Sequence, residues 1–190
     1  KLDDFAGSIV VLDFFAYWCV PCRKVSSDLE EYVQKFYTAK GGNAAGFPVQ
    51  VVSMNIEQGR AAKTRQYIKQ TGMNLVLNDV GGKVYQSLNG RGIPYVVVLT
   101  ETAGGSHWKI SYSHAGYEGY EKVREAIDSI RPDDPQAIRP LDKSTLDVGI
   151  PSAHGLEIGT DGLWSNDIFL TDTTATHVFT RGVNEFRTSY

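Results

Sequence analysis

The sequence predicts an α/β protein in which helices flank a central mixed β-sheet. Residues 9–15 form an almost uninterrupted apolar run, as expected of a strand that is buried on both faces. Apolar residues then recur at helical spacing from Val25 to Phe36. A second apolar run, Tyr95 to Leu99, is rich in β-branched residues and predicts another strand. Apolar strands that alternate with amphipathic helices favour a sheet layered by helices.

The other elements follow in order as far as residue 131. The first helix should end at Gly41-Gly42, with its polar residues, among them Ser26 and Glu30, on the solvent face. After it we expect a strand at 49–54, a helix at 60–70, a short strand at 75–77, a helical turn at 84–88, a strand at 95–99, a strand at 108–112 and a helix at 120–130. The stretch from residue 55 to residue 90 is therefore an α/β insertion.

A break rich in proline and charge, Arg131 to Pro135, divides the chain. We expect one domain at residues 1–131 and a C-terminal extension at residues 132–190. The extension has short strand-like segments at 168–170, 177–179 and 183–187, separated by glycine-containing turns. We therefore expect it to be β-rich, or to be the beginning of an incomplete second domain. Its function is not readable from the sequence.

Charge and composition argue against several classes of partner and ligand. A net charge of -3 gives no reason to expect binding to nucleic acid. No apolar run is long enough to span a membrane, but the chain begins at Lys1 without a methionine, which leaves a membrane anchor upstream of residue 1 open. Zinc takes about four ligands. The chain offers two cysteines with no paired histidines nearby, so we expect no metal and no other cofactor.

The two cysteines of the chain, Cys19 and Cys22, stand where the first strand passes into the first helix. Pro21 between them suits the first turn of a helix. Cysteines at positions i and i+3 there can form a disulfide, and the positive end of the helix dipole lowers a thiol pKa. A lone C-x-x-C pair beside a strand and a helix is more typical of redox chemistry or metal binding than of a structural staple. The pair is the leading candidate for catalysis.

Asp13 is the one charged residue inside the first apolar run. A buried carboxylate is costly unless it is neutral or has a partner. It could be a strand-end aspartate that binds backbone, or a proton acceptor for a buried thiol. Its position just before the cysteines favours the second interpretation.

Three features together resemble the thioredoxin superfamily. Trp18-Cys19-Val20-Pro21-Cys22 matches the W-C-x-x-C motif, Asp13 stands where many thioredoxins carry a buried acid, and Gly92-Ile93-Pro94 matches the loop that holds a cis proline. The resemblance covers residues 1–131 and is nearest to the TlpA/ResA-like extracytoplasmic branch, because of the lead-in to Gly7 and the insertion between residues 55 and 90. Two positions depart from the pattern. Tyr95 follows the proline where threonine is common, and Ser53 falls where a lysine often partners the acid.

The resemblance implies a thioredoxin-like fold and a thiol–disulfide oxidoreductase that reduces protein disulfides through a mixed disulfide. Cys19 would be the more exposed, nucleophilic thiol, Cys22 the resolving thiol and Asp13 its proton acceptor. Trp18, Ile93 and Pro94 would contact the substrate, with Ile93–Pro94 as a cis bond.

The implied partners are protein thiols and disulfides together with an upstream reductant. The implied location is periplasmic or otherwise extracytoplasmic, with a membrane anchor or the cytoplasm left open. The alternative is a redox-sensing or partner-binding module that uses this fold to present residues 132–190.

Overall fold

The computed structural model describes residues 2–102, 108–131, 168–170 and 179–181. Its main sheet has five strands in the order β3-β2-β1-β4-β5. They run as follows: β1 Ile9–Phe15, β2 Val49–Asn55, β3 Val76–Asn78, β4 Tyr95–Glu101 and β5 Trp108–Ala115. Strand β1 is central, parallel to β2 and antiparallel to β4. The sheet is mixed, as the sequence predicts.

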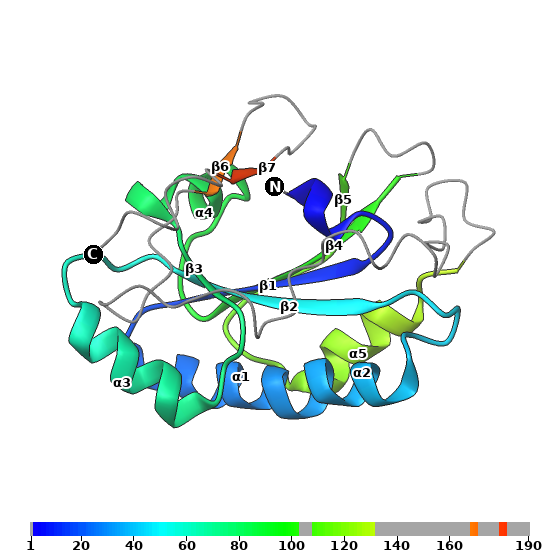
Figure 1. Ribbon diagram of the computed structural model, residues 1–190, viewed down its shortest axis with the longest axis horizontal. Helices are drawn as coiled ribbons and strands as arrows, with labels where there is room; N and C mark the ends of the chain where they lie inside the picture. Colours follow the sequence, from blue (N-terminus) through cyan, green and yellow to red (C-terminus); the bar gives the residue numbers. More distant parts are fainter. Residues whose placement is uncertain (1, 103–107, 132–167, 171–178, 182–190) are drawn as a thin grey trace.

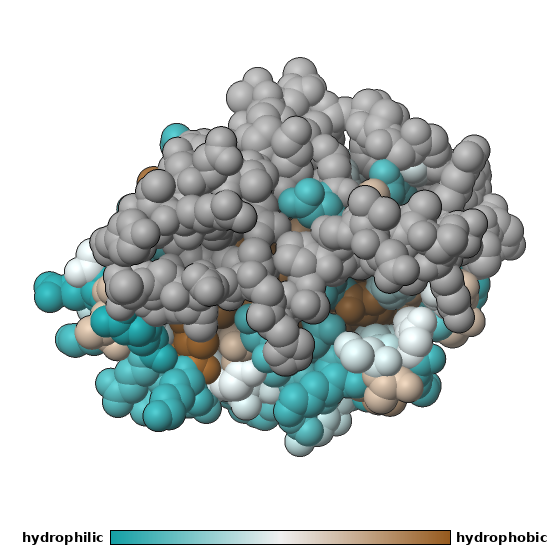
Figure 2. Space-filling view, viewed as in Figure 1, coloured by the Kyte–Doolittle hydropathy of each residue, from teal (hydrophilic) through white to brown (hydrophobic). Residues whose placement is uncertain are grey.

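Helices cover both faces of this sheet. They run as follows: the 3₁₀ turn η1 Leu2–Phe5, α1 Val20–Leu29, the π turn η2 Glu30–Gln34, α2 Lys35–Lys40, α3 Ala61–Thr71, the 3₁₀ turn η3 Val80–Gly82, α4 Lys83–Ser87 and α5 Tyr120–Asp128. Figure 1 shows α1, α2, α3 and α5 in one layer, with α4 and η1 on the opposite side. The layer of α1, α2, α3 and α5 lies at the bottom of Figure 1. Figure 2, drawn from the same side, shows hydrophilic residues along this edge of the molecule. None of the described helices has the length and apolar composition that crossing a bilayer requires.

Strand β1 is buried along its whole length, because both faces of the sheet are covered. Side chains alternate between the two faces of a strand. Ile9 and Val11 pack in the core under α1 and α5, whereas Leu12 and Phe14 pack in the core under α4. Asp13 follows the alternation of Ile9 and Val11 and therefore lies on the α1 side.

The first helix ends where the sequence predicts, with Gly41 as its C-cap, but it is less regular than expected. Val25, Leu29, Val33 and Tyr37 are all buried, whereas Phe36, expected in the core, is only partly buried. These four buried residues are each four positions apart, which is more than the 3.6 residues of an α-helical turn. The π turn η2 inserts one extra residue between α1 and α2. This insertion turns Tyr37 rather than Phe36 toward the core.

Two polar residues of this helix are buried, so their expected exposure is wrong. Ser26 is 1% exposed and Glu30 is 4% exposed. The Glu30 carboxylate accepts hydrogen bonds from the backbone N–H of Asn74, at 3.3 Å, and from its side-chain amide. The connection from α3 to β3 therefore covers this side of the helix. Burial raises the pKa of Glu30, and the two Asn74 bonds oppose that rise.

The extension beyond residue 131 is described only at two short strands. Strands β6 (Ile168–Leu170) and β7 (Phe179–Arg181) pair in antiparallel fashion. Strand β6 matches the expected segment, while β7 begins at the last residue of the expected 177–179 strand. The expected strand at 183–187 lies outside the described residues, so the division into residues 1–131 and 132–190 stays a prediction.

Asn43 ties the connection between α2 and β2 to the end of α5. Its amide group donates hydrogen bonds to the carbonyl of Ile127, at 2.9 Å, and to that of Ile130, at 3.3 Å. Its carbonyl oxygen accepts hydrogen bonds from the backbone N–H groups of Ala45 and Phe47, both at 3.0 Å. The side chain is buried and uses its full hydrogen-bonding capacity here.

We expect Asn43→Ala to lower the free energy of unfolding by about 3 kcal/mol, because buried backbone groups at both ends lose their partners. Urea denaturation followed by circular dichroism measures the change. Lys122→Ala, which removes an exposed ion pair with Glu125 on α5, should leave the midpoint nearly unchanged. Equal midpoints for Asn43→Ala and the wild type would contradict the assigned role.

Candidate active site

Cys19 and Cys22 are joined by a disulfide, with their Cα atoms 5.3 Å apart. Strand β1 ends at Phe15, and a tight turn closed by the Cys19 N–H donating to the Ala16 carbonyl, at 3.0 Å, leads into α1. Cys19 is the N-cap residue of α1, and its Sγ accepts a hydrogen bond from the Cys22 N–H at 3.3 Å. The sulfur therefore occupies the position at which a helix start favours an anion.

Both sulfurs are buried. Cys19 is 3% exposed and Cys22 is 0% exposed. Cys19 is thus the more exposed of the two, as the resemblance implies, but only by a small margin. Side chains from β1, α3, β3 and the connections next to them form a cluster with the disulfide: Phe15, Ala16, Tyr67, Met73 and Val76, with the partly buried Tyr17, Ile56, Ile68 and Ile93 at the margin.

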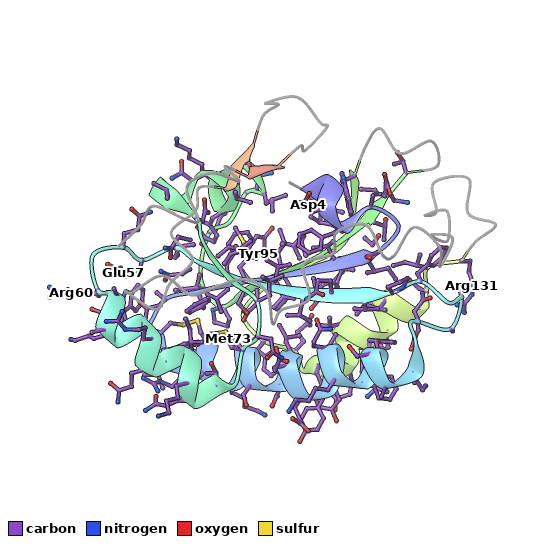
Figure 3. The ribbon with its side chains drawn as sticks, viewed as in Figure 1. Asp4, Glu57, Arg60, Met73, Tyr95 and Arg131 are labelled. Carbon is purple, nitrogen blue, oxygen red and sulfur yellow. A yellow bond between two sulfur atoms is a disulfide. The ribbon has the colours of Figure 1, made fainter. Side chains whose placement is uncertain are left out.

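Trp18 is a surface residue beside the disulfide. It is 55% exposed, and its indole N–H donates to the Glu57 carboxylate at 2.9 Å. Glu57 lies in the connection between β2 and α3, together with Arg60 (Figure 3). The hydrogen bond fixes one edge of the indole, while about half of the side chain stays exposed. Val20, between the cysteines, is a second exposed apolar residue and is 75% exposed.

The Ile93–Pro94 peptide bond is cis and immediately precedes β4. Pro94 is buried, and its carbonyl accepts a hydrogen bond from the Gly116 N–H at 2.8 Å. Ile93 is partly exposed and packs against the cluster that contains both cysteines. The structure therefore brings Ile93 together with the disulfide, although the two are far apart in the sequence.

Asp13 is fully buried below α1. The Ser26 hydroxyl donates a hydrogen bond to Oδ2 of Asp13 at 2.7 Å. Ser26 Oγ in turn lies 3.3 Å from the Tyr67 hydroxyl. Oδ1 of Asp13 has no hydrogen-bond partner among the described residues. Burial raises the pKa of Asp13 to about 7, and the hydroxyls of Ser26 and Ser53 act in the opposite direction.

Sequence reasoning missed Ser26 and Tyr67. Ser26 follows Cys22 by four residues, so it shares the helix face of a buried cysteine, and this spacing could have identified it. Tyr67 reaches the site only because α3 packs against α1, which no local pattern reveals. Its ring stacks on Phe15 at a centroid distance of 4.9 Å, and the Arg23 guanidinium lies 5.2 Å above its centroid.

A cavity of about 320 Å³ opens between α1 and α3 next to the disulfide. Aromatic and cationic side chains line it: Tyr17, Trp18, Arg23, Lys63, Gln66 and Tyr67. Arg23 and Lys63 form no ion pair with any described carboxylate. Within the described part of the chain, no cluster of histidine, cysteine and acidic residues is suited to hold a metal ion.

Comparison with known proteins reveals one family. A family profile described as thioredoxin-like matches residues 7–104, which is more than half of the chain. A thioredoxin of Coprinus comatus is 39% identical over 41 residues, which cover 19% of this chain and 39% of that protein. The match therefore spans less than half the length of this relative.

Solved structures resemble the chain over a longer stretch. A candidate thiol:disulfide interchange protein DsbE from Chlorobium tepidum has a TM-score of 0.54 and 27% identity, over 68% of this chain and 84% of that chain. A secreted thiol-disulfide isomerase from Corynebacterium glutamicum shares the fold, with a TM-score of 0.53 and 21% identity over 67% of this chain and 73% of that one. The similarity to DsbE confirms the likeness to the TlpA/ResA-like branch. Because the family profile matches more than half of this chain, the chain belongs to the thioredoxin-like family.

Proposed function

We propose that this protein is a thiol–disulfide oxidoreductase that reduces disulfides in other proteins. The observation that carries the proposal is the Cys19–Cys22 disulfide at the first turn of α1, with Cys19 Sγ capping the helix. A sulfur held at this position gains from the helix N–H groups when it becomes a thiolate, and the thiolate is the species that attacks a disulfide.

The reaction follows from the two cysteine positions. In the reduced protein, the Cys19 thiolate attacks one sulfur of the substrate disulfide, which forms a mixed disulfide and expels a substrate thiolate. Cys22 loses its proton and attacks Cys19 Sγ, which restores the intramolecular disulfide and releases the second substrate thiolate. Two electrons pass to the substrate, and both substrate thiolates take up protons. An upstream dithiol returns the Cys19–Cys22 pair to its reduced form.

Asp13 is the proposed acceptor for the Cys22 proton. It lies on the α1 side of β1, and its Ser26 partner is one helical turn beyond Cys22. Oδ1 has no hydrogen-bond partner among the described residues, so a lone pair is available to take a proton. A carboxyl with a pKa near 7 is suited to accept and release protons at neutral pH.

The substrate would dock over Trp18 and Ile93. Trp18 offers an exposed aromatic side chain, and Ile93, which precedes the cis Pro94, packs against the cluster that contains both cysteines. Cys19 is only 3% exposed, so we expect the substrate to displace neighbouring side chains before its disulfide reaches the nucleophile.

An extracytoplasmic location is part of the proposal. The insertion between β2 and β4, which comprises α3, β3, η3 and α4, is the feature that resembles the TlpA/ResA-like branch. The resemblance also leaves a membrane anchor upstream of residue 1 open. The reduction potential of the Cys19–Cys22 pair tests the direction of catalysis, since a reductase needs a potential below that of the disulfides it reduces.

We expect Cys19→Ser to lower the reduction of insulin to the background rate of dithiothreitol alone, because the attacking thiolate is lost and the remaining Cys22 is fully buried. Cys22→Ser should instead accumulate a mixed disulfide between Cys19 and insulin, detectable by mass spectrometry of the alkylated mixture. Ser27→Ala, an exposed change on the same helix, should keep full activity. Reduction that does not depend on Cys19 would contradict the catalytic proposal and favour the partner-binding alternative.

We expect Asp13→Asn to lower the turnover of insulin by about 10²-fold at pH 7, because the amide cannot accept the Cys22 proton. The mixed disulfide should persist longer in this variant than in the wild type. Quenched-flow trapping of the intermediate measures the resolving step directly. An unchanged lifetime of the mixed disulfide would assign Asp13 no part in resolution.

The same substitution should change stability in a pH-dependent manner. The folded-state pKa of Asp13 lies above its unfolded value of 3.8, so the stability contributed by the protonated carboxyl is complete below about pH 4 and is lost as the pH rises through 7. Asparagine stays neutral and can still accept from Ser26. Asp13→Asn should therefore be more stable than the wild type by up to about 4 kcal/mol at pH 8, and equally stable at pH 4. Denaturation curves of the oxidised proteins at both pH values measure this difference.

A further inference from the structure

The hydrogen bonds around Asp13 have a direction that can be derived from the donors. A serine hydroxyl carries a single proton. When Asp13 is ionised, Ser26 donates that proton to Oδ2, at 2.7 Å. The contact of 3.3 Å between Ser26 Oγ and the Tyr67 hydroxyl must then have tyrosine as the donor. Ionised Asp13 is therefore the end of a chain in which Tyr67 donates to Ser26 and Ser26 donates to the carboxylate.

We propose that Ser26 and Tyr67 are positioning residues that set the proton affinity of Asp13, and with it the pH range in which Cys22 is deprotonated for attack on the mixed disulfide. The catalytic half of this inference rests on the proposed function. The half that concerns Asp13 does not, because it depends only on the hydrogen bonds of the folded protein.

Each member of the chain is held by the packing of a different element. Asp13 comes from β1, Ser26 from α1 and Tyr67 from α3, and their exposed fractions are 0%, 1% and 1%. The stacking of Tyr67 on Phe15 fixes the phenol ring, and α1 places Ser26 next to it. Water is excluded from all three, so a hydroxyl donor has a larger effect on the carboxylate than it would have at the surface.

The surroundings supply few other groups that could control Asp13. On β2 the residue opposite Asp13 is Ser53, and on β4 it is the apolar Val96. The facing cation is Arg23 of α1, which lies above the Tyr67 ring and lowers the pKa of that phenol, against a larger rise caused by burial. The other titratable groups on this side include the two cysteines of α1, when reduced, and the buried Glu30, four residues beyond Ser26, whose pKa is raised by burial. Asp13 thus has hydroxyl donors in place of a direct ion pair, which makes its ionisation sensitive to each hydroxyl.

Titration of the Asp13 carboxyl carbon by NMR in the oxidised, full-length protein tests the first half. Because a hydrogen bond to a charged group is lost, Ser26→Ala should raise the midpoint by about one pH unit. Tyr67→Phe should raise it by a smaller amount. Tyr67 acts through Ser26, so the double variant should titrate like Ser26→Ala alone. The Ser53 hydroxyl acts on Asp13 independently of Ser26 and Tyr67. The shift in the Asp13 midpoint caused by Ser53→Ala should therefore add to the shift caused by Tyr67→Phe.

Tyr37→Phe is the matched control. Tyr37 is also 1% exposed, but its hydroxyl donates to the Arg124 carbonyl at 3.4 Å in the core between the first helix and α5. Its removal should reduce stability equally at all pH values and leave the Asp13 midpoint unchanged. If Tyr67 has only a structural role, Tyr67→Phe should likewise lose stability and leave the Asp13 midpoint unchanged. That outcome would overturn the proposal, even if Ser26→Ala failed to fold.

The pH profile of the resolving step tests the second half. In Tyr67→Phe the profile should shift to higher pH by the same amount as the Asp13 midpoint. A shifted midpoint with an unshifted profile would overturn the link to Cys22. If insulin reduction does not depend on the cysteines at all, the proposed function fails, and the NMR titration still decides whether the hydroxyl chain controls Asp13.

Discussion

The pairing of β1 with a parallel strand on one side and an antiparallel strand on the other determines where the site lies. Parallel pairing brings the carboxyl ends of β1 and β2 to one edge of the sheet, and antiparallel pairing brings the beginning of β4 to the same edge. Phe14 lies opposite Tyr95. The turn to Cys19 and the cis bond before Tyr95 therefore meet at this edge, although they are far apart in the sequence.

Burial of β1 on both faces also explains the electrostatics of the site. A strand without a solvent face holds an ionised carboxylate only at a cost that its partners must offset. In this chain the partners of Asp13 are hydroxyls, because β2 places Ser53, and no cation, opposite Asp13. Hydroxyls oppose the effect of burial only in part, so the pKa of Asp13 remains near 7. The carboxyl therefore titrates in the range in which thiols exchange.

The parts of the site that depend on local pattern could be predicted from the sequence. The strand, the cysteine pair at the helix start and the loop at Pro94 each have a short sequence signature, and the fold class is confirmed. The parts that depend on contact between distant elements could not. Ser26 and Glu30 are polar residues that the amphipathic pattern assigns to solvent, and they are buried because α3 and its connection to β3 lie over them. Tyr67 belongs to the site for the same reason.

The π turn between α1 and α2 separates two requirements that a regular helix would have to meet together. At its beginning, the helix must point Cys22 and Ser26 toward β1. At its end, it must point Tyr37 toward α5, where the phenol donates to the Arg124 carbonyl. The extra residue in Glu30–Gln34 sets the rotation of the second half independently of the first. Residues at the Cys22 end and at the Tyr37 end of this helix can therefore change in evolution without altering the direction in which side chains at the other end point.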